Sequence, residues 1–168
     1  ISVYGKSKLK GEEEARDILK EHVIVRTSWL FGKNGKHFIG AILSKAEREE
    51  RLFVVNDQRG GPTYTKDLAE AISILLGCMI ARGQGYGVYH ASNSGSVTWY
   101  DYARLILEMR GLAREVLPIT TGESKRPAPR PKNSVLDNSK FGAFTDFKLR
   151  QWDDAVKEYL GIERKENT

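Results

Sequence analysis

The 168 residues, of which 40% are hydrophobic and 29% charged, have the composition of a soluble globular protein, which excludes an intrinsically disordered chain. No apolar stretch reaches the roughly 18 uninterrupted residues of a membrane span, so we expect no membrane partner. The net charge of +5 fits a phosphate-bearing small molecule as well as a polynucleotide. Prolines in the densest basic cluster, residues 123–132, argue against a nucleic-acid-reading helix, so no nucleic acid polymer is expected.

The first predicted elements are a helix and a short strand. Residues 3–20 are expected to form a helix. Its apolar face contains Leu9, Ala15, Ile18 and Leu19. Its acidic residues Glu12, Glu13 and Glu14 are expected to be solvated. The apolar, β-branched run at residues 22–26 is typical of a buried parallel strand. It ends in a loop that contains Trp29.

The remaining segments continue the alternation of helices and strands, which predicts an α/β fold. Further helices are expected at residues 37–50, 66–83, 98–111 and 150–161, and further strands at residues 51–57, 87–92, 115–121 and 134–137. Thr65 or Asp67 is expected to cap the helix that Gly83 ends, and Thr98 with Asp101 has the spacing of a capping box. Residues 58–65 are expected to form a loop.

Cysteine and histidine usage indicates a reducing compartment and no metal site made by the protein alone. A single thiol, Cys78, cannot form an internal disulfide, which suits the cytoplasm, and we expect it to be a buried small hydrophobic residue. His22, His37 and His90 lie far apart in sequence without ligand-like spacing.

Tyr4 and Lys8 are spaced as an acid–base pair could be. Residues at i and i+4 of a helix share a face, and an ammonium group beside a phenol lowers the pKa of the phenol toward the working range. Such a pair could protonate the oxygen of a ketone that receives hydride at carbon. The same spacing also fits two ordinary surface residues.

Two segments contain candidate binding residues. In "NDQRGGPTYT", Gly60, Gly61 and Pro62 predict a tight loop whose N–H groups could approach a ligand; the alternative is a plain turn between a strand and a helix. In "RPAPRPKNS", the guanidinium of Arg130, or that of the nearby Arg126, could pair with a diphosphate, unless this segment is only a solvated connector.

Five segments, in order and spacing, resemble the dTDP-4-dehydrorhamnose reductase family of extended short-chain dehydrogenases/reductases acting on nucleotide sugars. They are "SVYGKSKLKGE", "RTSWLFG", "VVNDQRGGPTYTKDLA", "GVYHASNSGSVTWYDYARLIL" and "RPAPRPKNSVLD". The resemblance implies reduction of a dTDP-4-keto sugar with NADPH or NADH, and it allows a role for Mg²⁺. One departure is Gly61, where family members often carry Ser.

The same resemblance implies roles for individual residues. Tyr4 matches the proton donor to the C4 keto oxygen, and Lys8 matches the lysine that binds the nicotinamide ribose. Trp29 matches a tryptophan that contacts the sugar ring. The implied substrate contacts in the two loops are Gln58, Arg59, Thr63 and Arg130.

The resemblance also predicts how the chain is organised. Residues 1–32 are expected to be the last helix and strand of a Rossmann-like domain, and residues 33–168 a substrate-binding α/β region. The sequence contains no glycine-rich dinucleotide-binding turn. We therefore expect the C-terminal portion of a reductase, inactive alone and prone to self-association through exposed apolar surface. The alternatives are another nucleotide-sugar reductase or epimerase, and a non-catalytic binding subunit.

Overall fold

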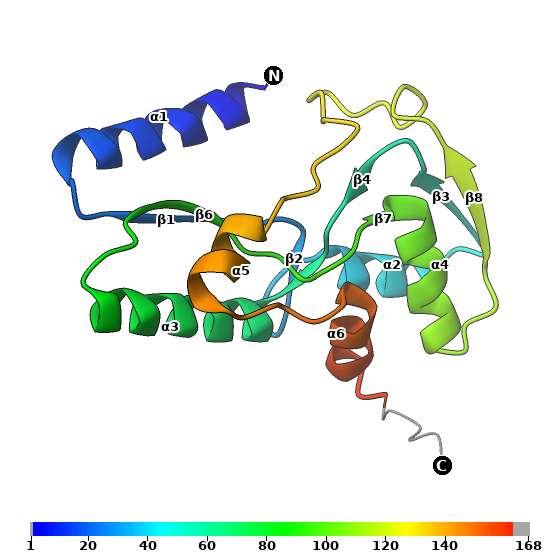
Figure 1. Cartoon of the computed structure of the whole chain (residues 1–168). Helices are drawn as coiled ribbons and strands as arrows, with labels where there is room; N and C mark the ends of the chain where they lie inside the picture. The colour runs from blue at the N-terminus through cyan, green and yellow to red at the C-terminus, as the bar shows by residue number, and fades with distance from the viewer. Residues whose placement is uncertain (1, 163–168) are drawn as a thin grey trace, which may run out of the picture.

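The computed structural model describes residues 2–162, along which helices and short strands alternate (Figure 1). The helices are α1 (Val3–Ile18), α2 (Phe38–Ala46), α3 (Thr65–Arg82), α4 (Trp99–Met109), α5 (Ser139–Thr145) and α6 (Trp152–Tyr159). The strands are β1 (Val23–Arg26), β2 (Leu30–Phe31), β3 (Arg51–Val55), β4 (Arg59–Gly60), β5 (Thr63–Tyr64), β6 (Gly87–His90), β7 (Val97–Thr98) and β8 (Glu115–Ile119). None of the helices in this range is both long and apolar enough to cross a membrane.

The strands form pairs that are mostly parallel, which confirms the α/β prediction. β1 pairs with β6, β2 with β5, and β3 with β8, all in parallel, while β4 and β7 are antiparallel. Each parallel pair is separated in sequence by at least one helix, as a parallel connection requires.

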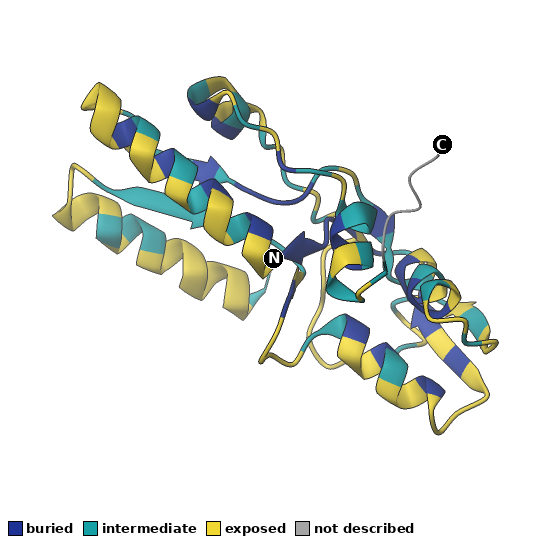
Figure 2. Ribbon diagram, turned by 90° about the horizontal axis from the view of Figure 1, so that it is seen from below, coloured by how far each residue is buried: buried dark blue, intermediate teal, exposed yellow. Residues whose placement is uncertain are grey.

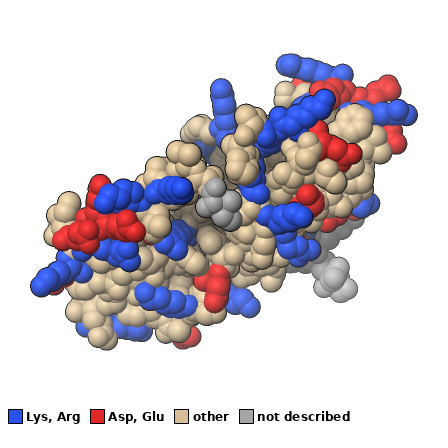
Figure 3. All heavy atoms as spheres, turned by 90° about the horizontal axis from the view of Figure 1, so that it is seen from above, with Lys and Arg blue, Asp and Glu red and all other residues tan. Residues whose placement is uncertain are grey.

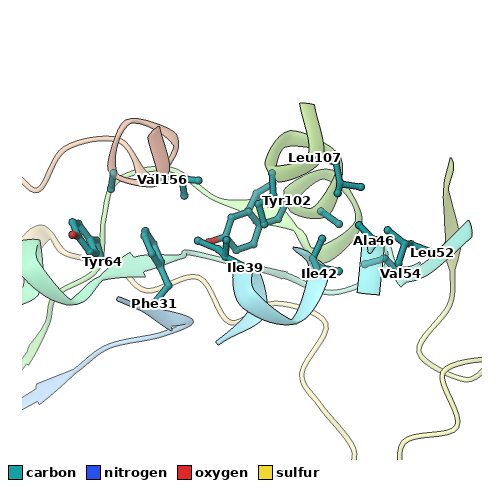
Figure 4. Close-up of a cluster of buried hydrophobic side chains, with 14 residues drawn as sticks. Phe31, Ile39, Ile42, Ala46, Leu52, Val54, Tyr64, Tyr102, Leu107 and Val156 are labelled. Carbon is teal, nitrogen blue, oxygen red and sulfur yellow. The ribbon is translucent and has the colours of Figure 1, made fainter. Parts of the chain in front are cut away.

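Two apolar clusters hold the elements together. The larger lies between α2, α4, α6 and strand β3, with Ile39, Tyr102 and Ile106 at 0–1% exposure (Figure 4). The smaller packs α3 and α5 against β6 through Leu75, Tyr89 and other buried side chains. Figure 1 shows these two groups of elements at opposite ends of an elongated molecule, joined through the short central strands.

Helix α1 lies outside both clusters. It contains no buried residue, and Figure 2 shows its surface exposed or half-exposed along its whole length. Among the described residues, β1 pairs only with β6, so its other edge is unpaired. Glu12 is not simply solvated as predicted, because its carboxylate binds the Arg26 guanidinium through Nε–Oε1 (2.8 Å) and Nη2–Oε2 (2.5 Å) contacts. This pair ties α1 to β1 and lowers the pKa of Glu12 through the hydrogen bonds from Arg26.

Helix boundaries confirm two predicted caps and correct a third. Thr98 accepts a hydrogen bond from the Asp101 N–H at the start of α4, and Gly83 ends α3 in the left-handed conformation. Neither Thr65 nor Asp67 caps α3: its N-cap position is Tyr64, without a side-chain cap. The Asp67 carboxylate binds Arg150 instead.

Other differences concern short elements and one thiol. Residues 134–137 form no strand, and the helix α5 that follows them was not predicted. The expected loop at residues 58–65 contains β4 and β5, each of two residues, which are too short to show a strand period. Cys78 is half-buried rather than buried.

Candidate functional site

A cavity of about 670 Å³ lies between α2, β3 and the proline-rich segment that follows β8. Its apolar wall includes Phe38, Ile42, Phe53 and Trp99, and Gln58 contributes an amide. The wall has no carboxylate, whereas its cationic side chains are Lys36, Lys45, Arg126 and Arg130. Lys45 also pairs with Glu49, which lies outside the wall, at 4.0 Å. A cavity with an apolar wall and several cationic side chains is suited to an anionic ligand with a planar or apolar part.

Arg130 lies beside Arg126 in the wall of the cavity. Burial, and secondarily the neighbouring Arg126 guanidinium, lower the pKa of Arg130. Two guanidinium groups that face the same space without a carboxylate gain from binding a phosphate, because each can form paired N–H···O bonds with it. Elsewhere the basic side chains are spread over the face shown in Figure 3, without one continuous block.

A hydrogen-bond network holds the chain just before the proline-rich basic segment, residues 123–132. The Asp57 carboxylate accepts from both the N–H (2.9 Å) and the hydroxyl (2.6 Å) of Thr121. Gln58, only 5% exposed, donates from Nε2 to the Thr121 hydroxyl oxygen at 2.9 Å. The hydrogen bond from the Thr121 side chain lowers the pKa of Asp57. The end of β3 is therefore joined to the start of the segment that carries Arg126 and Arg130.

Trp29 stacks on Trp99 and does not line the cavity itself. The two ring centroids are 3.3 Å apart with 8° between the planes. Trp29 adopts φ 46°, a left-handed conformation that costs a non-glycine residue about 1 kcal/mol. Gly60 leaves room for the ring, because a Cβ there would lie 2.3 Å from Trp29 Cε2.

Arg59 and Thr63 lie on the Trp29 side of the site. The exposed Arg59 donates from Nη1 to the Ser96 hydroxyl at 2.9 Å, and its backbone pairs with Lys132 and Ser134. Thr63 is fully buried, and its N–H donates to the Trp29 carbonyl at 3.2 Å. Of the predicted substrate contacts, only Gln58 and Arg130 line the same cavity.

Tyr4 and Lys8 share the exposed surface of α1. Tyr4 is 72% exposed, and Lys8 Nζ lies 5.6 Å from the centre of its ring. Ser2 caps the helix by accepting a hydrogen bond from the Gly5 N–H, so the pair is on the first turns of a formed helix. Neither residue lines the cavity.

Sequence reasoning missed the contribution of α2 to the cavity. His37 caps this helix with Nδ1, which accepts from the Gly40 N–H, and its Nε2 lies 3.0 Å from the Tyr159 hydroxyl. Burial lowers the pKa of His37, which favours the neutral ring. The only sequence signal was the run "GKNGKH", with Lys36 beside His37, immediately before the helix. Within residues 2–162 no group of three or more His, Cys, Asp or Glu side chains could hold a metal ion.

The chain has an α/β fold with a cavity lined by cationic and apolar side chains. The chain belongs to the RmlD substrate binding domain family, whose sequence model matches residues 1–164. It is 43% identical over 159 residues to the spore coat polysaccharide biosynthesis protein SpsK of Bacillus subtilis, which covers 95% of this chain and 54% of that protein. It is 36% identical over 166 residues to the dTDP-4-dehydrorhamnose reductase of Salmonella typhimurium, covering 95% of this chain and 56% of the relative.

Solved structures give the same family. The dTDP-4-dehydrorhamnose reductase of Clostridium acetobutylicum superimposes with a TM-score of 0.86 at 37% identity, covering 95% of this chain and 55% of that one. The enzyme of the same name from Bacillus anthracis, solved in complex with NADP, superimposes with a TM-score of 0.85 at 32% identity. The match covers 96% of this chain and 55% of that one. The family resemblance and fold class predicted from the sequence are thereby confirmed. The chain spans about half the length of the curated relatives it matches.

Proposed function

We propose that the chain is the substrate-binding part of an NAD(P)H-dependent dTDP-4-dehydrorhamnose reductase, which converts dTDP-4-dehydro-L-rhamnose to dTDP-L-rhamnose. The single observation that carries the proposal is the cavity, in which cationic side chains from α2 and from the proline-rich segment face an apolar wall without any carboxylate. The family membership and the reductase names of the relatives support the same reaction.

In this proposal the cavity holds the dTDP moiety. Arg126 and Arg130 pair with the diphosphate, Gln58 offers an amide to the base or ribose, and the apolar wall accommodates the ring. The sugar extends toward Trp29, with Arg59 on the same side and Thr63 supporting Trp29 through its backbone. Within residues 2–162 no group of three or more His, Cys, Asp or Glu side chains could hold Mg²⁺.

The proposed catalytic pair is Tyr4 and Lys8. When bound, the nicotinamide cofactor supplies hydride to C4 of the keto sugar. Tyr4 gives its proton to the keto oxygen, and Lys8 holds the nicotinamide ribose and favours the phenolate that remains. The exposure of Tyr4 leaves its hydroxyl available to a cofactor and a substrate. We further propose that residues 1–32 belong to a Rossmann-like cofactor domain and residues 33–168 to the substrate-binding region.

The proposal is tested by NADPH oxidation in the full-length reductase, with a panel of dTDP- and GDP-linked 4-keto sugars. We expect turnover with the dTDP-4-keto sugar, and a loss of at least about 100-fold in kcat for Tyr4→Phe, the scale of a missing general acid. The control is Tyr86→Phe, which removes the hydroxyl of another exposed tyrosine that does not line the cavity.

Three results would contradict the proposal. A preference for GDP sugars indicates a different nucleotide-sugar enzyme. Inversion at carbon without net NADPH consumption indicates an epimerase. An unchanged rate in Tyr4→Phe means that the Tyr4 and Lys8 pair is not catalytic, as in a non-catalytic binding subunit.

A further inference from the structure

We propose that Trp99 is a positioning residue that transmits occupation of the cavity to Trp29. The inference rests on the proposed function, because it takes the cavity as the dTDP site and Trp29 as the sugar contact. It adds a role for Trp99, whose indole is in contact with both. The chain of contacts runs from the cavity to Trp99, from Trp99 to Trp29, and from Trp29 to Gly60.

Trp99 belongs to the wall of the cavity, whereas Trp29 does not. A ligand confined to the cavity, such as dTDP without its sugar, therefore reaches Trp99 directly and Trp29 only through it. Phe38, at 4.5 Å between ring centroids, holds Trp99 from the α2 side. Any ligand that displaces the Trp99 indole must also displace the ring stacked on it, because the two centroids are only 3.3 Å apart.

The stack is an arrangement that aromatic rings do not adopt by preference. Rings favour offset or edge-to-face contacts with centroids 4.5–7 Å apart, whereas this pair is nearly parallel and much closer. Trp29 also has a positive φ, which is uncommon for a bulky residue. The close stack and the positive φ both involve Trp29, which lies beside the candidate site. Strained conformations are concentrated at functional sites, where they contribute to function.

The backbones of both tryptophans are attached to the short segment that contains β4 and β5. Trp99 directly follows β7, whose Val97 and Thr98 pair with Gly60 and Arg59 of β4. The Trp29 carbonyl accepts from the Thr63 N–H, and the Ser28 hydroxyl donates to the Gly61 carbonyl at 2.8 Å. With the backbones held in this way, the side chains are the parts free to move, so the indole contact is the route by which a ligand acts on Trp29.

The test is ¹⁹F NMR of the 168-residue chain labelled with 5-fluorotryptophan, titrated with dTDP. The three resonances are assigned from single Trp→Phe variants. We expect dTDP to shift the resonances of Trp29 and Trp99. The resonance of Trp152 should stay in place, since Trp152 does not line the cavity and is separated from Phe38 and Trp99 by Tyr102, which it meets edge-on. In Trp99→Leu, we expect dTDP to bind no more than about tenfold more weakly, the scale of one aromatic contact, while the Trp29 shift is lost.

Two further variants keep the test decisive if Trp99→Leu fails to fold. In Gly60→Ala the three atoms nearest to the new Cβ all belong to the Trp29 ring, at 2.3–2.6 Å, so the substitution displaces Trp29 first. We expect the Trp99 response to dTDP to persist and the Trp29 response to disappear. In the matched control Gly61→Ala the new Cβ meets its nearest atom, the Gly95 carbonyl, at 3.5 Å, an ordinary contact, so both responses should remain. In the full-length reductase, Trp99→Leu should lower kcat more than it raises KM.

The outcomes separate this inference from the proposed function. If dTDP binds and Trp29 responds as strongly in Trp99→Leu as in the wild type, Trp99 does not transmit occupation and the inference is wrong. If dTDP binds the wild type and shifts only Trp99, the inference is also wrong, while the dTDP site stands. If dTDP neither shifts a resonance nor binds, the proposed function fails, and this inference fails with it.

Discussion

The Arg150 guanidinium binds both oxygens of the Asp67 carboxylate, with Nε–Oδ2 and Nη2–Oδ1 distances of 2.8 and 2.7 Å. Asn93 donates to the same carboxylate at 2.6 Å and accepts from the Tyr64 N–H. The third guanidinium nitrogen of Arg150, Nη1, forms an ion pair with the Glu158 carboxylate. The start of α3 is thus fastened to α6 across the centre of the molecule, and the hydrogen bond to Asp67 raises the pKa of Arg150, which keeps it charged.

Loss of this pair should destabilise the fold strongly. Arg150→Met leaves the Asp67 carboxylate, 9% exposed, without its cation, and we expect a loss of about 3 kcal/mol in the free energy of unfolding. The matched control is Arg51→Met, which breaks a pair with Glu115 whose side chains are 70% and 53% exposed, and which should cost less than about 1 kcal/mol. Urea denaturation measures both. If both variants lost the same unfolding free energy, burial would not account for the strength of the Arg150–Asp67 pair, and the prediction would be wrong.

The hydroxyl of Thr121 should matter for ligand binding. Thr121→Val removes the hydroxyl bonds to Asp57 and Gln58 and keeps the backbone N–H bond to Asp57. We therefore expect dTDP to bind up to about tenfold more weakly, the scale of one ordinary hydrogen bond. Thr120→Val is the control, because the Thr120 hydroxyl has the exposed Glu123 as its only hydrogen-bond partner among the described residues. Calorimetry of both variants is the measurement, and equal affinities would contradict the role of the network.

The same network gives a pH dependence with a defined sign. Thr121 lowers the folded-state pKa of Asp57 below 3.8, so the ionised carboxylate stabilises the fold. This stabilisation is complete above the unfolded pKa and is lost as the pH falls through the folded value. The difference in unfolding free energy between wild type and Thr121→Val should therefore be constant near neutrality and shrink below about pH 4. A difference that grows on acidification would contradict this.

As the pH is lowered, protonation of His37 should reduce the stability of the fold before protonation of the carboxylates does. Burial lowers its pKa below 6.5, so the unfolded chain takes up the proton more readily than the folded one. Stability is complete above about pH 6.5 and falls as the pH drops toward the folded pKa. His37→Asn keeps a capping side chain and should remove this decline, whereas Tyr159→Phe, which leaves the imidazole buried, should retain it. Urea midpoints across this pH range decide between these results.

The exposed side of α1 should make the 168-residue chain self-associate. Leu9 and Ile18 are 47% and 79% exposed on a helix without a buried residue. We expect the sedimentation-derived mass to rise with concentration, and to rise less in Leu9→Ser/Ile18→Ser. The control is Leu76→Ser/Ile80→Ser, at 45% and 84% exposure on the packed helix α3. A monomer at all concentrations would contradict the prediction.

Sequence patterns predicted the helices and strands that depend on interactions between residues close together in the sequence. The helices from Val3, Phe38 and Trp99 follow from apolar periodicity and nearby caps, and β3 and β8 follow from β-branched runs. The two-residue strands have no readable period. Residues 134–137 have strand-like composition, but at this position only the Arg59–Asn133 bridge forms beside them.

The errors at the site arise from contacts between residues far apart in sequence. Asp67 looked like a helix cap, but Arg150 takes its carboxylate across the molecule. Gln58 and Arg130 could be chosen because their loops had unusual composition, and they do line one cavity. The stacking of Trp29 on Trp99 has no local signal, because only the pairing of β4 with β7 and the space at Gly60 bring the rings together.

The most direct test of the central claim is a calorimetric titration of the chain with dTDP. We expect saturable binding at one site, weakened at least about 100-fold in Arg126→Ala/Arg130→Ala, because both guanidinium groups that pair with the diphosphate are lost. The control Arg48→Ala/Arg110→Ala removes the same charge from exposed positions and should bind as the wild type does. Absence of dTDP binding, or binding that the Arg126 and Arg130 substitutions leave unchanged, would contradict the account.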